Sequence, residues 1–267
     1  MCKICDIKNK ANPLNLFDEA EIDRVIQGIF LGTISVNALD YYTYQKVASK
    51  LTSGVYDGFG KDLTHLVYGT PDYVMLSELR TNVYIFSGAK QYQQVRAMSA
   101  LLTNEGKVNS YGDFHKEAKK VFNTYNENYL HTEYNSAIAQ ARSASMWMDI
   151  EKDKEILPML QYVTAGDGRV RPEHATLNGI TRAVDDKFWD IYFPPNDWNC
   201  RCTTIQLGSD AEKTSLRGFK PTEANVPEVF RFNAGKAKIV FSNEHPYYKV
   251  APRDKKWAKQ NFGLPIP

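Results

Sequence analysis

The sequence predicts an α+β protein: a helical N-terminal part, a small domain of two helices packed on a short antiparallel sheet, and an extended C-terminal tail. Two observations carry this prediction. Apolar residues recur at helical spacing through most of residues 18–157, and two short runs, 160–163 and 203–205, have the length of strands. Changes in composition along the chain predict three regions, with boundaries 1–107, 108–207 and 208–267.

The first two helices are predicted from a capping box and a glycine stop. Asp18 and Glu21 have the spacing at which each side chain caps the other residue's backbone N–H, and apolar residues follow at helical spacing. Gly32 ends this helix, and Asn37 begins a second one. The glycine-rich connection 54–61 lacks a Gly-Lys-Ser/Thr ending, so it does not predict a phosphate-binding loop.

A long third helix is predicted to begin at Thr70-Pro71, because threonine is a good N-cap and proline suits the first helical position. It runs toward Leu102, with an interruption near Ser87-Gly88. The polar stretch 103–112 then predicts a linker.

Two more helices are predicted in the region 108–207. The first begins near Phe114 and carries an apolar stripe to Tyr129. The second begins at Thr132 and is rich in alanine, which allows close contact with another helix. Pro158 ends it, and the first predicted strand follows.

The region between the two predicted strands is rich in turn residues. Asn178-Gly179 predicts a type I′ turn, and a Pro194-Pro195 pair precedes the second strand. Beyond that strand, two short strands are predicted at 229–232 and 237–241, around an Asn-Ala-Gly turn.

Composition places the chain among ordinary globular proteins. It has 267 residues, a formal net charge of +2 and 24% charged residues. It has no apolar run of 18 residues and no apolar segment near the N-terminus, so we expect no membrane span, no secretion signal and a cytoplasmic site of synthesis. Disulfides are disfavoured there, so the close pairs Cys2/Cys5 and Cys200/Cys202 are predicted to be metal ligands or free thiols.

The residues between the strands predict a structural zinc site. Cys200 and Cys202 alternate along an extended chain, so both thiols face one side, and His174 supplies a nitrogen ligand. Asp167, or a cysteine of the N-terminal Cys-x-x-Cys, is the candidate fourth ligand. The alternative is a pair of buried thiols beneath tryptophan rings, with a histidine bonded to a backbone carbonyl.

A catalytic interpretation uses the same residues. Cys200 or Cys202 would be a thiolate nucleophile, His174 its base, and Asp167 the residue that orients the histidine. A nucleophile needs one activated thiol, whereas two thiols on one face suit joint ligation or joint burial. We therefore predict a protein that is not an enzyme and has no small-molecule substrate, with a thiol-dependent enzyme as the alternative function.

Two groups of basic residues are candidates for DNA contact. Four lie around a tryptophan near the C-terminus and predict weak binding to phosphates without sequence preference: Arg253, Lys255, Lys256 and Lys259. Arg169 and Arg171 are predicted instead to pair with acidic residues nearby, among them Asp167, Glu173 and Asp185.

The ordered pattern D-x-R-V-R-P-x-H, then a leucine with N-G, then PPNDWNCRC, resembles the phage Mu F-like head morphogenesis (minor head protein) family over about residues 110–207. The resemblance implies a minor head protein of a tailed bacteriophage or prophage, present in the host cytoplasm during capsid assembly and then in the virion head. It also implies the phage portal or coat protein as partner, and DNA in some members.

Overall fold

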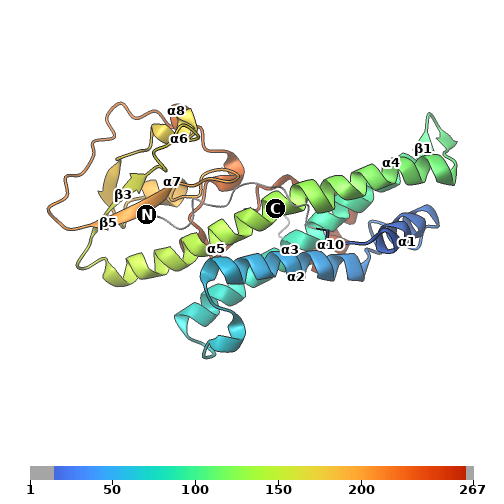
Figure 1. The fold of residues 1–267 in the computed structure, drawn as a ribbon, viewed down its shortest axis with the longest axis horizontal. Coiled ribbons are helices and arrows are strands. Elements are labelled where there is room, and N and C mark those ends of the chain that lie inside the picture. The colour runs from blue at the N-terminus through green and yellow to red at the C-terminus, as the bar shows by residue number, and fades with distance from the viewer. Residues whose placement is uncertain (1–14, 263–267) are drawn as a thin grey trace.

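The computed structural model describes residues 15–262, and it confirms the predicted α+β class with a mainly helical N-terminal part (Figure 1). The α-helices are α1 Glu19–Phe30, α2 Tyr41–Phe59, α3 Pro71–Ser99, α4 Tyr111–Asn123, α5 Leu130–Asp153, α6 Pro172–Ala175, α7 Phe188–Tyr192, α8 Pro221–Ala224, α9 Ala234–Ala237 and α10 Lys255–Phe262. Short 3-10 helices are η1 Leu63–His65, η2 Ala100–Leu102, η4 Glu228–Phe230, η5 Pro246–Tyr248 and η6 Pro252–Asp254, and η3 Thr124–Tyr129 is a π-helix. The strands are β1 Thr103–Asn104, β2 Lys107–Val108, β3 Met159–Val163, β4 Thr181–Ala183 and β5 Thr203–Leu207. None of the described helices is long and apolar enough to cross a membrane.

Local capping chemistry sets the first helix starts. The Asp18–Glu21 capping box is present, with both side chain to backbone bonds at 2.9 Å. The second helix begins at Tyr41 and not at Asn37, because the Asp40 carboxylate caps it by accepting from the Thr43 N–H.

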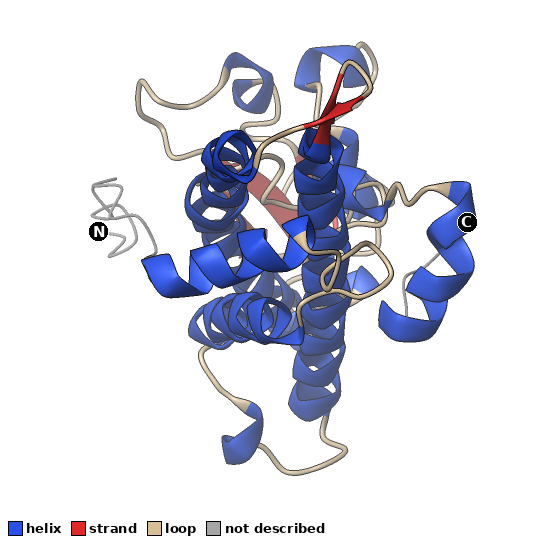
Figure 2. Cartoon of the chain, turned by 90° about the vertical axis from the view of Figure 1, so that its right-hand side faces the viewer, coloured by secondary structure: helices blue, strands red, loops and turns tan. Residues whose placement is uncertain are grey.

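The third helix is unbroken, so the predicted interruption at Ser87-Gly88 is wrong. The Ser87 hydroxyl donates to the Val83 carbonyl of its own helix and therefore needs no break in it. The predicted linker after α3 contains the β1–β2 hairpin, whose turn uses positive φ at Glu105 and Gly106. This hairpin lies at one end of the molecule, well away from the three-stranded sheet (Figure 1), and that end faces the viewer in Figure 2.

The predicted helices from Phe114 and Thr132 form one continuous rod. The π-helical turn η3 joins α4 to α5, and the rod spans the length of the molecule (Figure 1). The α5 part of the rod packs against α2, where Gly54 and Gly58 allow close approach to Tyr134 and Ile138. A Cβ added to Gly58 would lie 2.1 Å from the Ile138 carbonyl oxygen.

The three-stranded sheet has the order β4-β3-β5 and is antiparallel throughout. Both strands predicted at 160–163 and 203–205 are therefore present. Asn178-Gly179 is not a type I′ turn, because Gly179 has φ of 79° and Asn178 is not in the left-handed region. The Asn178 side chain instead accepts from the backbone N–H and hydroxyl of Thr164, at the start of the loop after β3.

The chain after the sheet returns to the helices. The short strands predicted at 229–232 and 237–241 are wrong: η4 overlaps the first, and the second is the last residue of α9 followed by a turn. Asn82 on α3 bonds both backbone N–H groups of Val240 and Phe241 and the Phe241 carbonyl, so a side chain satisfies the groups that a strand partner would have used. Residues 252–262, expected as part of an extended tail, form η6 and α10.

The described part of the chain has two parts that differ in their apolar cores. The helical body is residues 15–153 with 233–262, and the sheet module is residues 158–232. The module's core also includes Trp147 and Ile150 from the end of α5. The boundaries predicted at 107/108 and 207/208 remain predictions.

Candidate metal centre

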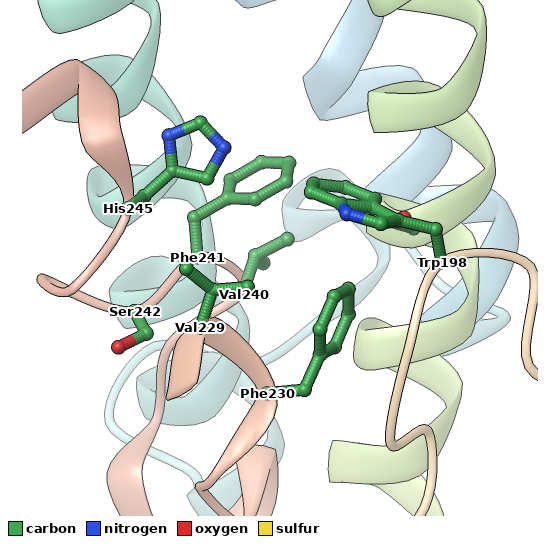
Figure 3. A pocket seen from close by; sticks show the side chains of 8 residues that line it. Trp198, Val229, Phe230, Val240, Phe241, Ser242 and His245 are labelled. Carbon is green, nitrogen blue, oxygen red and sulfur yellow. The ribbon is translucent and has the colours of Figure 1, made fainter. Parts of the chain in front are cut away.

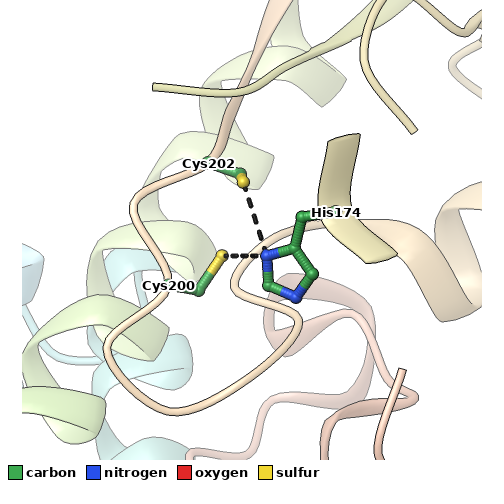
Figure 4. Close-up of side chains that lie close together, drawn as sticks. All are labelled: His174, Cys200 and Cys202. Atoms are coloured by element: carbon green, nitrogen blue, oxygen red, sulfur yellow. Dashed lines mark hydrogen bonds between the residues drawn. The ribbon is translucent and has the colours of Figure 1, made fainter. Parts of the chain in front are cut away.

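Three predicted site residues come together on the sheet module (Figure 4). His174 lies on α6, which begins with Pro172 at its first position and follows the loop after β3. Cys200 and Cys202 lie on the chain that leads into β5. Because β3 and β5 are antiparallel neighbours and Val163 pairs with Thr203, the histidine loop (residues 164–174) and the cysteine loop (residues 193–202) meet at the same end of the sheet.

The geometry suits one small cation. His174 Nδ1 lies 3.6 Å from the Cys200 sulfur and 3.7 Å from the Cys202 sulfur, and all three atoms are within 4.8 Å of one another. Zinc bonds of the usual length at a tetrahedral angle would separate a nitrogen and a sulfur by about 3.6 Å. The histidine is 3% exposed, so the cluster could hold a metal in a site shielded from solvent.

The two thiols are electrostatically coupled. A hydrogen bond from Cys202 is the largest effect that lowers the pKa of Cys200, and His174 and the Asn196 backbone N–H act in the same direction. The pKa of Cys202 is raised by its bond with Cys200, by burial and by the charge on Cys200. A bound divalent cation would offset the repulsion between two thiolate charges and so favour the ionised form of both cysteines.

Buried polar residues support the cysteine loop. Tyr162 on β3 is fully buried, and its hydroxyl donates to Asn196 Oδ1 at 2.9 Å. Burial and the nearby thiols raise the pKa of Tyr162, which keeps the phenol neutral. Neither Tyr162 nor Asn196 is predicted from the sequence to be part of the site. The alternation of β3 alone would place Tyr162 on one face with Leu160, but it could not show that this face carries the thiols.

Asp167 lies outside the cluster that the described residues form. Its two carboxylate oxygens accept from the two Nη atoms of Arg201, at 2.6 and 2.7 Å, and this pairing holds the pKa of Asp167 well below its usual range. Its role as a fourth ligand stays a prediction. Cys2 and Cys5, the other candidates, lie outside the described residues.

The basic residues of the module pair internally, as predicted. Arg169 contacts Asp167 at 3.4 Å, while Arg171 contacts Asp197 at 3.2 Å and donates to the Trp198 carbonyl. Asp197, and not Glu173 or Asp185, is therefore the partner of Arg171.

The four C-terminal basic residues lie on η6 and α10. Arg253 is 85% exposed at its side chain, Lys256 and Lys259 are exposed, and Lys255 is half-buried. This segment is fixed to the body because Tyr92 donates to the buried Asp254 at 2.7 Å. Their contact with DNA remains a prediction.

A small cavity lies where the module meets the body, between Trp198 and the segment that carries Phe241 and His245 (Figure 3). Its volume of about 10 Å³ suits a single water molecule and not a substrate. The metal cluster is therefore the stronger candidate for a functional site.

The fold and this cluster define a mainly helical protein that carries a compact histidine–cysteine module. Residues 80–205, from within α3 to β5, match the model of the family described as Phage Mu protein F like protein. The resemblance inferred from the motifs is thereby confirmed.

Two curated relatives match shorter stretches. The chain is 42% identical over 80 residues to the putative capsid assembly protein F of Escherichia phage Mu, and 34% identical over 91 residues to the Mu-like prophage FluMu F protein of Haemophilus influenzae. These stretches are 30% and 34% of this chain, and they span only 18% and 20% of the relatives' lengths. No solved structure matches the chain.

Proposed function

We propose that this chain is a minor head protein of a tailed bacteriophage or prophage, which acts in capsid assembly by binding to the portal or the coat protein. The observation that carries the proposal is the family match over residues 80–205, which includes the whole metal cluster. The name of the phage Mu relative, a putative capsid assembly protein, supports the same role. The protein would be made in the host cytoplasm and then enter the virion head.

The role would be binding and not turnover. The α4–α5 rod gives a rigid support, and the module would be the docking unit at one end of it. Exposed tyrosines on α2 and on the α2–α3 connection, such as Tyr41 at 71% and Tyr68 at 84%, offer further contact area of the type enriched at protein interfaces.

Particle composition tests this role. Phage particles are purified from a strain that carries this gene in an intact prophage, and their peptides are identified by mass spectrometry. We expect peptides of this chain in particles with the portal protein, at a copy number far below that of the coat protein. A phage protein that does not enter particles serves as the control for carry-over. Particles and proheads that lack this chain would contradict the proposal.

We further propose that His174, Cys200 and Cys202 bind one structural zinc. Two thiolates and an imidazole are the donor set that zinc prefers, and their spacing fits its bond lengths. The metal would fix the histidine loop to the cysteine loop. Elemental analysis of protein purified without added metal should find about one zinc per chain, and a zinc-free protein with reduced thiols would contradict the site.

DNA is a secondary partner in this proposal. Four phosphate contacts, from Arg253, Lys255, Lys256 and Lys259, would give binding without sequence preference and a log–log salt slope of about −3 to −4. Replacing the four residues with alanine should flatten that slope. An unchanged slope would place the DNA contact elsewhere on the chain.

One observation favours the alternative, a thiol-dependent enzyme: Cys200 contacts His174 at 3.6 Å, as a nucleophile contacts its base. Alkylation distinguishes a structural zinc site from a catalytic thiol. A structural zinc protects both thiols from iodoacetamide until a chelator is added, whereas a free nucleophile reacts at one thiol without a chelator.

A further inference from the structure

Two ion pairs join the histidine loop to the cysteine loop, and the acidic residue comes from a different loop in each pair. The histidine loop, residues 164–174, supplies Asp167 to Arg201, which lies between the two cysteines. The same loop supplies Arg171 to Asp197, three residues before Cys200. Each loop therefore gives one acid and one base to the other.

The Asp167–Arg201 pair is the stronger of the two. Nη1 of Arg201 donates to Oδ2 of Asp167 at 2.7 Å and Nη2 donates to Oδ1 at 2.6 Å, which is the bidentate geometry that fixes the two planes relative to each other. The loop behind Asp167 is also held, because its carboxylate accepts from the Arg169 N–H and its carbonyl accepts from the Val170 N–H. A change in the position of Asp167 would thus move the chain that leads to His174.

We infer that the pairs Asp167–Arg201 and Arg171–Asp197 form a clasp that positions Cys200 and Cys202 against His174, and that Asp167 is a positioning residue and not a metal ligand. The inference rests on the proposed metal site. Asp167 lies outside the cluster, and moving its carboxylate to the metal would break its bidentate bond with Arg201. The clasp also gives a role to four charged residues of the motif that the cluster itself does not use, namely Asp167, Arg171, Asp197 and Arg201.

Metal affinity tests the clasp. The variants are Asp167→Ala, Arg201→Ala and the two combined, and Arg169→Ala is the matched control because Arg169 is 70% exposed and contacts Asp167 only at 3.4 Å. Zinc affinity is measured by competition with a chromogenic chelator. Residues that orient metal ligands typically contribute about 10–100-fold to affinity, so we expect each single variant to bind in that range more weakly and the control to bind as the wild type does.

The pattern across the variants separates a clasp from a ligand. A clasp predicts similar losses for both single variants and no further loss in the double variant, because either change breaks the same contact. A ligand role for Asp167 predicts a loss only for Asp167→Ala, with equal or tighter binding for Arg201→Ala. That second pattern would overturn the inference.

The absorption spectrum of the cobalt-substituted protein reports which ligands bind the metal, and it does not depend on the stability of the fold. With Asp167→Asn, a clasp predicts an unchanged band shape at weaker affinity, and a changed band shape would overturn the inference by assigning Asp167 to the metal. Wild type that binds neither zinc nor cobalt would overturn the metal site and the clasp together. Tight wild-type binding with equally tight binding of Asp167→Ala and Arg201→Ala would overturn the clasp alone.

Discussion

The helical body and the sheet module are held together in different ways. In the body, long helices bury apolar residues along most of their length, and α2 approaches α5 closely at Gly54 and Gly58. In the module, no strand is longer than five residues, and polar side chains bond the backbone of distant segments. Gln206, for example, donates to the carbonyls of Ile150 and Leu157, and Trp189 donates to that of Ala183.

This difference shows why the metal cluster lies in the module. Long helices satisfy their own backbone groups, so burial of one face is sufficient to stabilise them. Short strands joined by long loops lose more backbone entropy for each apolar group that they bury. The proposed metal and the proposed ion-pair clasp would compensate for that loss where periodic packing cannot.

The largest expected effect is the loss of the metal. In Cys200→Ser/Cys202→Ser, zinc should be absent, and amides of β3 and β5 should lose protection from hydrogen exchange while those of α2 and α3 keep it. Structural zinc contributes roughly 10–16 kcal/mol in small peptides, and the module's own core makes that an upper bound here. Wild type treated with a chelator is the control and should behave like the variant. Equal protection in all three proteins would remove the contrast between body and module.

A buried ion pair in the body tests the contrast from the other side. Lys90 and Glu133 form a buried ion pair at 2.7 Å, at 1% and 3% exposure, and Tyr247 also donates to Glu133. Breaking such a pair leaves an uncompensated charge, so Lys90→Met should cost about 3–5 kcal/mol. The double variant Lys90→Met/Glu133→Leu should recover most of this lost stability, measured by urea unfolding. A double variant as unstable as the single would mean that the body, too, depends on polar contacts.

The sequence predicts the two regions to different depths. Helical periodicity identifies the long helices, and the capping residues Asp18 and Thr70 place two of their starts correctly. These signals are local, because they depend on residues three or four positions apart. Residue types and spacing also bring His174, Cys200 and Cys202 into one proposed site, which the structure assembles.

What the sequence misses depends on contacts between distant residues. Asn82 bonds the backbone near Phe241, 159 positions away, and so removes the need for the predicted strands. Asp167 meets Arg201 through the order of the strands, which no local pattern encodes. The prediction of Asp167 as a fourth ligand therefore takes no account of this ion pair.

The third prediction concerns pH and the segment that returns to the body. Burial, and secondarily the charge of Lys90, lower the pKa of His245 from 6.5 to about 4. The unfolded chain then binds more protons between pH 6.5 and 4, so this contribution to stability is complete above pH 6.5 and is lost as the pH falls to about 4. The loss should be roughly 3 kcal/mol, from about 1.4 kcal/mol per pKa unit.

His245→Asn is the matched control for that prediction. Asparagine cannot take up the proton, and its side-chain oxygen can replace Nδ1 as acceptor for the Tyr247 N–H. Urea unfolding across this pH range should therefore be flatter for the variant than for the wild type. Parallel curves would show that His245 is not the group responsible.

The smallest expected effect tests the close packing of the body. Gly58 and Gly112 both lie in α-helices, α2 and α4, but a Cβ at Gly58 would meet the backbone of Ile138, while a Cβ at Gly112 would meet nothing within 4 Å. Alanine is the better helix former, so Gly112→Ala should stabilise the protein by up to about 1 kcal/mol. At Gly58 the same change must push α2 away from α5, and overpacking of this kind costs about 1–3 kcal/mol. If thermal unfolding shows that Gly112→Ala stabilises the protein and Gly58→Ala destabilises it, the α2–α5 contact requires the absence of a side chain at Gly58. Equal stabilisation by both changes would show that the two helices can separate without cost.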